Sequence, residues 1–175
     1  MTLLKKFFFI FILFFLSISF LNAEEKVSYI DIDRVLSKSK AGSKLLEAIK
    51  KEEELKINEF KLNDDNFKNE EKKILAKKNL ISKEEFDKEI RTLQAKFQKY
   101  KKTKINEIDE LKKKRNKNIV NFLNLINPII EKYMADNSIY MLIDKKNVFI
   151  ASVEYDITNN LIELIDNQIK NVEIK

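Results

Sequence analysis

The chain has 175 residues, with 34 lysine and arginine residues against 28 aspartate and glutamate residues, and it contains one glycine, one proline and no cysteine, histidine or tryptophan. Glycine and proline interrupt regular structure, so their scarcity in a highly charged chain indicates long helices. Without cysteine and histidine, the usual nucleophile–base pairs and soft-metal ligands cannot form. We therefore expect no enzyme, no cofactor and no metal site.

The first 23 residues have the pattern of a secretory signal peptide. Lys5 and Lys6 precede an apolar run over residues 7–21, and Ala23 supplies a small residue at the exit. The run has 15 residues, fewer than the roughly 20 that span a bilayer as a helix. We expect cleavage after Ala23 and export to the periplasm. Retention of the segment as an N-terminal anchor is the alternative.

The mature chain opens with a predicted strand. Residues 26–32 are rich in β-branched and aromatic side chains that alternate between two faces. Residues 33–43, which contain Gly42, are predicted as a short helical turn or a linker.

Residues 44–127 are predicted to form two long helices, together called the arm. A seam of positions spaced by seven is apolar at every position except Glu53. A break near residues 78–82 ends the first helix, and Ser82 with Glu85 forms a capping box that starts the second. The short connection makes the helices antiparallel. The seam of the first helix consists of Leu46, Glu53, Phe60, Phe67, Ile74 and Ile81, and that of the second begins with Phe86, Ile90, Leu93, Phe97 and Tyr100.

The last part of the chain is predicted to be compact again. Pro128 either starts a fresh helical turn or kinks a continuous helix. Two strands, at residues 139–144 and 148–153, are joined by a hairpin loop at 145–147, and an amphipathic helix runs over residues 157–169. With residues 24–43, residues 128–175 make a β-rich body that receives both chain ends. A three-stranded sheet with one helix buries little surface, so we expect oligomerisation.

Positive charge concentrates in the arm. Residues 44–125 carry 23 basic and 16 acidic side chains, whereas the remaining mature residues carry 9 and 12. An electrostatic surface for an acidic partner and a solvated helix face both explain this excess. Nucleic acid is not expected as a partner because interleaved aromatic and arginine side chains are lacking. The excess is strongest at Lys96, Lys99, Lys101, Lys102, Lys104, Lys112, Lys113, Lys114, Arg115 and Lys117.

The order of several short motifs resembles that of one protein family. Tyr29-Ile30-Asp31, Ala41-Gly42 and Asp156-Ile157-Thr158 flank a charged helical hairpin of this length. In this respect the chain resembles the Skp (OmpH-like) family of periplasmic chaperones over essentially the whole mature sequence. Ser28 stands where the family usually has glycine.

The resemblance implies an α+β fold: a small β-rich trimerisation body with an antiparallel coiled-coil arm inserted between strands one and two. It also implies a homotrimer whose arms form a cage that holds unfolded outer-membrane β-barrel proteins without ATP. We expect the ten basic residues above to contact these clients. A structural, envelope-linking coiled coil and a cationic binder of lipopolysaccharide or an anionic membrane surface are the alternatives. The expected oligomerisation residues are Tyr29, Ile30, Ile32, Tyr140, Leu142, Val148 and Ile150.

Overall fold

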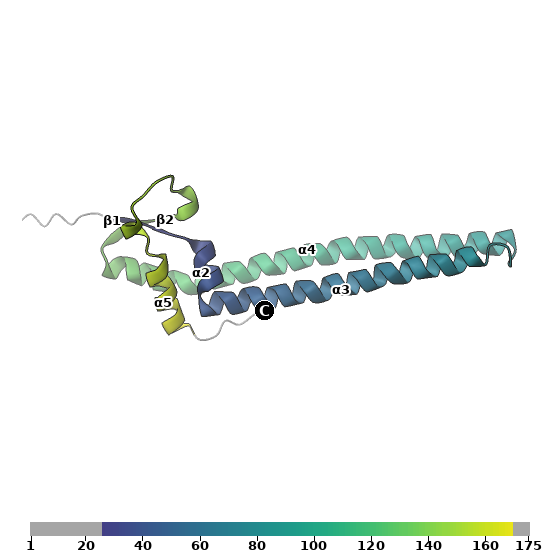
Figure 1. Ribbon diagram of the computed structural model, residues 1–175, viewed down its shortest axis with the longest axis horizontal. Helices are drawn as coiled ribbons and strands as arrows, with labels where there is room; N and C mark the ends of the chain where they lie inside the picture. The colour runs from purple at the N-terminus through teal and green to yellow at the C-terminus, as the bar shows by residue number, and fades with distance from the viewer. Residues whose placement is uncertain (1–25, 170–175) are drawn as a thin grey trace, which may run out of the picture.

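The computed structural model describes residues 26–169, in which a small body sits at one end of a long helical hairpin (Figure 1). The predicted signal segment, residues 1–23, lies outside the described residues. The body contains β1 (Lys26–Ile30), α2 (Ile32–Lys38), β2 (Ile139–Asp144) and α5 (Thr158–Gln168).

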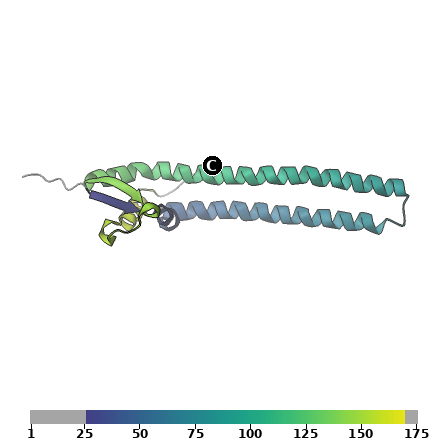
Figure 2. The same cartoon turned by 90° about the horizontal axis from the view of Figure 1, so that it is seen from above.

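The hairpin consists of α3 (Lys40–Ala76) and α4 (Lys83–Asp136), which lie side by side in both views (Figures 1 and 2). At 1.5 Å per residue these helices are about 55 and about 80 Å long. The predicted break between them is confirmed, because residues 77–82 form the turn at the tip. Ser82 caps α4 by accepting a hydrogen bond from the Glu85 amide at 3.2 Å. Among the described contacts, only this half of the predicted capping box is formed.

Pro128 lies inside α4, so the helix continues from the arm into the body. Of the two readings of this proline, the fresh helical start is wrong and the continuous helix is right. The exposed ring of Pro128 faces solvent, while the neighbouring Ile126, Ile129 and Ile130 are buried. Solvent therefore accommodates the ring, and the apolar face of the helix remains in the core.

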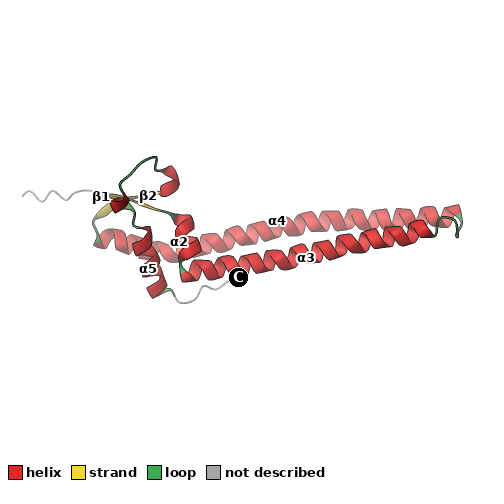
Figure 3. Cartoon of the chain, viewed as in Figure 1, coloured by secondary structure: helices red, strands yellow, loops and turns green. Residues whose placement is uncertain are grey.

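The sheet of the described chain has two strands, β1 and β2, which pair in parallel (Figure 3). The predicted strands at residues 26–32 and 139–144 are confirmed, the first being shorter than expected. The predicted strand at 148–153 and its hairpin are wrong. Residues 145–147 form a short 3₁₀ turn, residues 148–152 are irregular, and Val153–Tyr155 form a second such turn. The body is therefore largely helical and not β-rich.

The hydrophobic core lies where the arm joins the body. α4 contributes Phe122 and Ile126, both fully buried, and α5 covers them with Leu161 and Ile165. In each helix the two side chains are four residues apart and so lie on one face, as in amphipathic helices. The other main contributors are Ile30, Val35, Leu36, Leu45, Ile49 and Ile139.

Gly42 allows α2 and α3 to cross closely. A Cβ atom at this position would lie 2.2 Å from the carbonyl oxygen of Leu36. The buried Ser39 between the two helices accepts a hydrogen bond from the Gly42 amide at 3.1 Å and so caps α3. The tight corner explains why the chain has its single glycine here.

Asp156 and Thr158 attach α5 to the end of β1. The hydroxyl of Thr158, which is fully buried, accepts a hydrogen bond from the Asp31 amide at 2.9 Å. The Asp156 carboxylate accepts one from the Thr158 amide at 3.0 Å, and the Ile157 amide donates to the Tyr29 carbonyl at 3.1 Å. Burial raises the pKa of Asp156, but the hydrogen bonds from Thr158 and the positive charges of Lys145 and Arg34 together outweigh it and hold this pKa below its usual range.

Candidate functional site

The basic surface of the arm is partly neutralised by contacts between the two helices. Lys96 pairs with Glu70 at 2.9 Å, and Lys114 pairs with Glu52 at 2.7 Å. Arg115 lies 3.6 Å from Glu53. These ion pairs are exposed, so each contributes little to stability, but they reduce the charge that is available to a partner.

Lys104 is the most enclosed of the ten predicted basic residues. Its ammonium group lies 2.7 Å from Asp64 and above the rings of Phe60 and Tyr100. The hydrogen bond to Asp64 raises the pKa of Lys104, and the same bond lowers the pKa of Asp64. Both groups therefore stay charged over a wide pH range, and Lys104 links the helices.

The remaining predicted cations divide into two groups. Lys112 and Lys113 pair with Asp109 and Glu110 one turn earlier in their own helix. Of the ten predicted basic residues, four make no ion pair within residues 26–169 and are exposed to solvent: Lys99, Lys101, Lys102 and Lys117. Sequence patterning identified the basic segment but could not separate these four from the six that are paired.

A cluster of aromatic rings lies between the helices at mid-arm. The rings of Phe67 and Phe97 meet edge to face with centroids 5.3 Å apart, and Tyr100 lies 5.1 Å from Phe67. The Tyr100 hydroxyl donates a hydrogen bond to the Phe60 carbonyl at 3.0 Å. This cluster borders a groove of about 570 Å³. The seam pattern had predicted these residues as helix contacts and gave no sign of the groove.

The predicted oligomerisation residues separate into buried and exposed sets. Tyr29 and Ile30 are buried in the body, and Ile32 and Leu142 pack against the core. Val148 is half-buried. Tyr140 and Ile150 are 63% and 87% exposed, so within one chain they are not core residues. The prediction missed further exposed apolar side chains in the same region, namely Val27, Met141, Phe149, Val153 and Tyr155.

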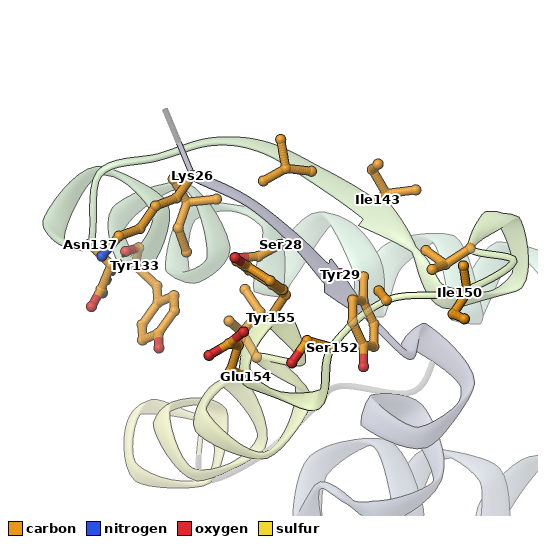
Figure 4. A pocket seen from close by; sticks show the side chains of 15 residues that line it. Lys26, Ser28, Tyr29, Tyr133, Asn137, Ile143, Ile150, Ser152, Glu154 and Tyr155 are labelled. Carbon is orange, nitrogen blue, oxygen red and sulfur yellow. Dashed lines mark hydrogen bonds between the residues drawn. The ribbon is translucent and has the colours of Figure 1, made fainter. Parts of the chain in front are cut away.

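A cavity of about 810 Å³ lies beside β1 (Figure 4). Ser28 and Tyr29 of the strand border it, and Ile150 and Tyr155 of the segment after β2 lie on its other side. The side chains around it are mostly apolar, with Glu154 as an acidic member. The cavity offers space for apolar side chains but no arrangement for catalysis.

No group of three or more acidic side chains that could hold a metal ion occurs within residues 26–169. Over the same residues, no helix is both long enough and apolar enough to cross a membrane.

A family model and a solved structure each match most of this chain. The model of the family described as outer membrane protein (OmpH-like) matches residues 26–165. The fold is similar to the crystal structure of an OmpH-like protein from Caulobacter crescentus CB15, with a TM-score of 0.75 and 22% identity over 84% of this chain and 87% of that one. A comparison with curated proteins found no match. The family match spans the body and the arm, and the chain belongs to the OmpH-like outer membrane protein family.

Proposed function

We propose that this chain is an ATP-independent holdase chaperone of the periplasm that binds unfolded outer-membrane β-barrel proteins. The observation that carries the proposal is the arm. This chain belongs to the OmpH-like family, and its two long helices extend well beyond its core. The helices present unpaired cations and uncovered apolar side chains. The Caulobacter crescentus neighbour is itself described as a candidate outer membrane chaperone.

The charge on the arm suits a partner that is acidic and unfolded. Lys99, Lys101, Lys102 and Lys117 give a positive surface whose attraction acts over about 8–10 Å at physiological salt. Such a surface accelerates the encounter with acidic chains without recognising a particular sequence. A holdase needs this property because its clients differ in sequence.

Assembly into a homotrimer is part of the proposal. Exposed apolar side chains around the sheet, including Met141 at 55% and Phe149 at 103%, are candidates for burial against another copy, because exposed apolar patches mark interaction surfaces. Within the described chain, β2 pairs on one side only, so its other edge is available to a second copy. The family resemblance implies three copies. We propose that residues 24–43 and 128–175 form the assembling body and residues 44–127 the client-binding arm.

A direct test measures holdase activity without nucleotide. A urea-unfolded eight-stranded outer-membrane β-barrel protein is diluted into buffer with and without the mature protein, and aggregation is followed by light scattering. We expect the protein to keep the client soluble when three copies are present per client. Unchanged aggregation at this ratio would contradict the chaperone proposal and favour a structural role for the coiled coil.

Assembly is tested on the same sample by sedimentation velocity. Replacing Phe149 and Ile150 with Ser removes exposed apolar surface without opening the core, so the parent is expected to sediment as a trimer and the variant as smaller species. A trimer with both substitutions would show that another surface drives association.

A further inference from the structure

The groove at mid-arm has an aromatic and aliphatic floor that the chain itself leaves partly uncovered. Leu93 at its floor is buried, whereas Phe97 is 38% and Ile105 is 58% exposed. Its volume of about 570 Å³ lies within the roughly 300–1,000 Å³ typical of ligand sites. Helix pairing alone would be served better by side chains that are fully enclosed.

Two of the ion pairs between the helices, Lys96–Glu70 and Lys114–Glu52, lie on a different side of the arm from the opening of the groove. Glu52 and Glu70 are 18 residues apart in α3, as are their partners Lys114 and Lys96 in α4. Eighteen residues make five full helical turns, so both ion pairs lie on the same side. Phe97 follows Lys96 directly and is therefore turned by about 100° away from that side. One side of the arm therefore carries these two ion pairs and is called the ion-paired side, and the aromatic groove opens away from it.

A cation without a carboxylate partner stands at the rim of the groove. The Lys101 ammonium lies 5.7 Å from the centroid of the Phe97 ring, and no ion pair involves it in the described chain. The two other lysines of the rim are occupied, because Lys104 pairs with Asp64 at 2.7 Å and Lys68 with Asp65 at 3.3 Å. Asp64 and Glu71 also line the groove, so among the lining residues Lys101 is the one cation that is free to pair with an incoming carboxylate.

We propose that this groove binds an aromatic side chain of an unfolded client, at a point where the client carries an acidic neighbour. The inference rests on the proposed chaperone function and assigns one site within it. The client ring packs against Phe97 and Ile105, edge-to-face or offset contacts being favourable between aromatic rings. The adjacent carboxylate pairs with Lys101 at the rim. The ion-paired side of the arm takes no part.

The absence of tryptophan from the chain permits a direct measurement. The probe is the peptide Gly-Ser-Asp-Trp-Asp-Ser-Gly, whose indole emission shifts to the blue when it enters an apolar site. The peptide is titrated with the full mature protein at low salt. Replacing the indole by an alanine side chain removes the signal, so a competition titration compares the two peptides, and the alanine peptide is expected to compete at least tenfold less well.

The groove variant is Phe97→Gln with Ile105→Gln, and the matched control is Leu55→Gln with Leu62→Gln. The control leucines are 64% and 63% exposed, belong to α3 and do not line the groove. We expect the groove variant to bind the peptide about tenfold more weakly and the control to bind like the parent. The single variant Ile105→Gln, which leaves the aromatic rings in place, should show a smaller loss, while helicity by circular dichroism is unchanged in all three.

Equal weakening by groove and control variants, or no blue shift with the parent, overturns the site. A change of oligomeric state in the groove variant alone also overturns it, because the groove would then be occupied by a second copy. Aggregation assays with the unfolded β-barrel protein separate the two proposals. A parent that suppresses aggregation but shows no groove dependence retains the chaperone function and loses the site. A parent that does not suppress aggregation loses both.

Discussion

Replacing Gly42 by alanine tests how tightly the arm is joined to the body. The added methyl carbon would lie 2.2 Å from the carbonyl oxygen of Leu36 and 2.8 Å from its carbonyl carbon, whereas ordinary contacts begin at 3.4 Å. Both atoms belong to the backbone, so no side-chain rotation relieves the overlap. α2 and α3 must therefore separate by about 1 Å, which loosens the contacts of the buried Val35 and Leu45.

Two opposing effects set the magnitude of the change. Alanine is the better helix former by about 1 kcal/mol, and overpacking of a rigid core costs about 1–3 kcal/mol, or more where backbone must move. Because the obstacle here is backbone, we expect a cost of about 3–4 kcal/mol, so that after the gain in helix propensity Gly42→Ala lowers the free energy of unfolding by about 2–3 kcal/mol. For a chain of this size that corresponds to a fall in Tm of about 5–10 °C.

Thermal unfolding followed by circular dichroism at one fixed protein concentration gives the comparison, since association links stability to concentration. Ser43→Ala is the matched control, because Ser43 is the next residue of α3 and is exposed. We expect the control to stay within about 0.5 kcal/mol of the parent. A Tm of Gly42→Ala equal to or above that of the parent would show that helix propensity outweighs the close approach and would refute the reasoning.

Four further outcomes are expected. Pro128→Ala should raise the free energy of unfolding by about 1–3 kcal/mol, because it restores a helical hydrogen bond at an exposed site; a loss of stability in urea titrations would contradict this. Thr158→Val should lower it by about 1–3 kcal/mol, because the Asp31 amide loses its buried acceptor; Thr158→Ser, which keeps the hydroxyl, is the control. The pKa of Asp156 is lower in the folded than in the unfolded protein. The Asp156 carboxylate therefore contributes stability above its unfolded pKa near 4, and this contribution is lost as pH falls through the folded pKa. In thermal scans the parent should lose stability relative to Asp156→Asn between pH 5 and pH 2. Replacing all four unpaired lysines by glutamate should slow association with an unfolded β-barrel protein about tenfold at low salt and much less at high salt in stopped-flow measurements. Equal rates for variant and parent at low salt would show that the four lysines are only a solvated face. The four are Lys99, Lys101, Lys102 and Lys117.

The elements that sequence reasoning located correctly are those whose signal is local. The seam spacing and the cap at Ser82 depend on residues within a few turns of one another, so they specified the two helices and the tip. The strand at residues 26–30 was predicted from its own β-branched residues, and its partner strand β2 lies in the same chain. The bounds of elements whose signal lies in residues close together in the sequence were therefore predictable.

The segment at residues 148–153 shows where local patterning fails. Its apolar run has the composition of a strand, but within the described chain no strand edge pairs with it, and Phe149 and Ile150 remain exposed. A strand requires a partner that composition does not reveal. In the same way, Lys114 and Glu52 are far apart in the sequence, and their pairing depends on the register between α3 and α4. Counting charges in the sequence therefore overestimated the number of free cations on the arm.

The attachment of the arm has a mechanical consequence. Fully buried core side chains reach only as far as Leu45 on α3 and Phe122 on α4, and the roughly 40 Å of α3 beyond Ile49 extends without the body beside it. A beam fixed at one end converts a small rotation at its base into a large displacement at its free end. From Gly42 to the end of α3 at Ala76 the helix is about 51 Å long, so a rotation of about 5° at the Gly42 corner would move the tip by about 4.5 Å. Slight repacking at the base is thereby a means of adjusting the space that the arm borders.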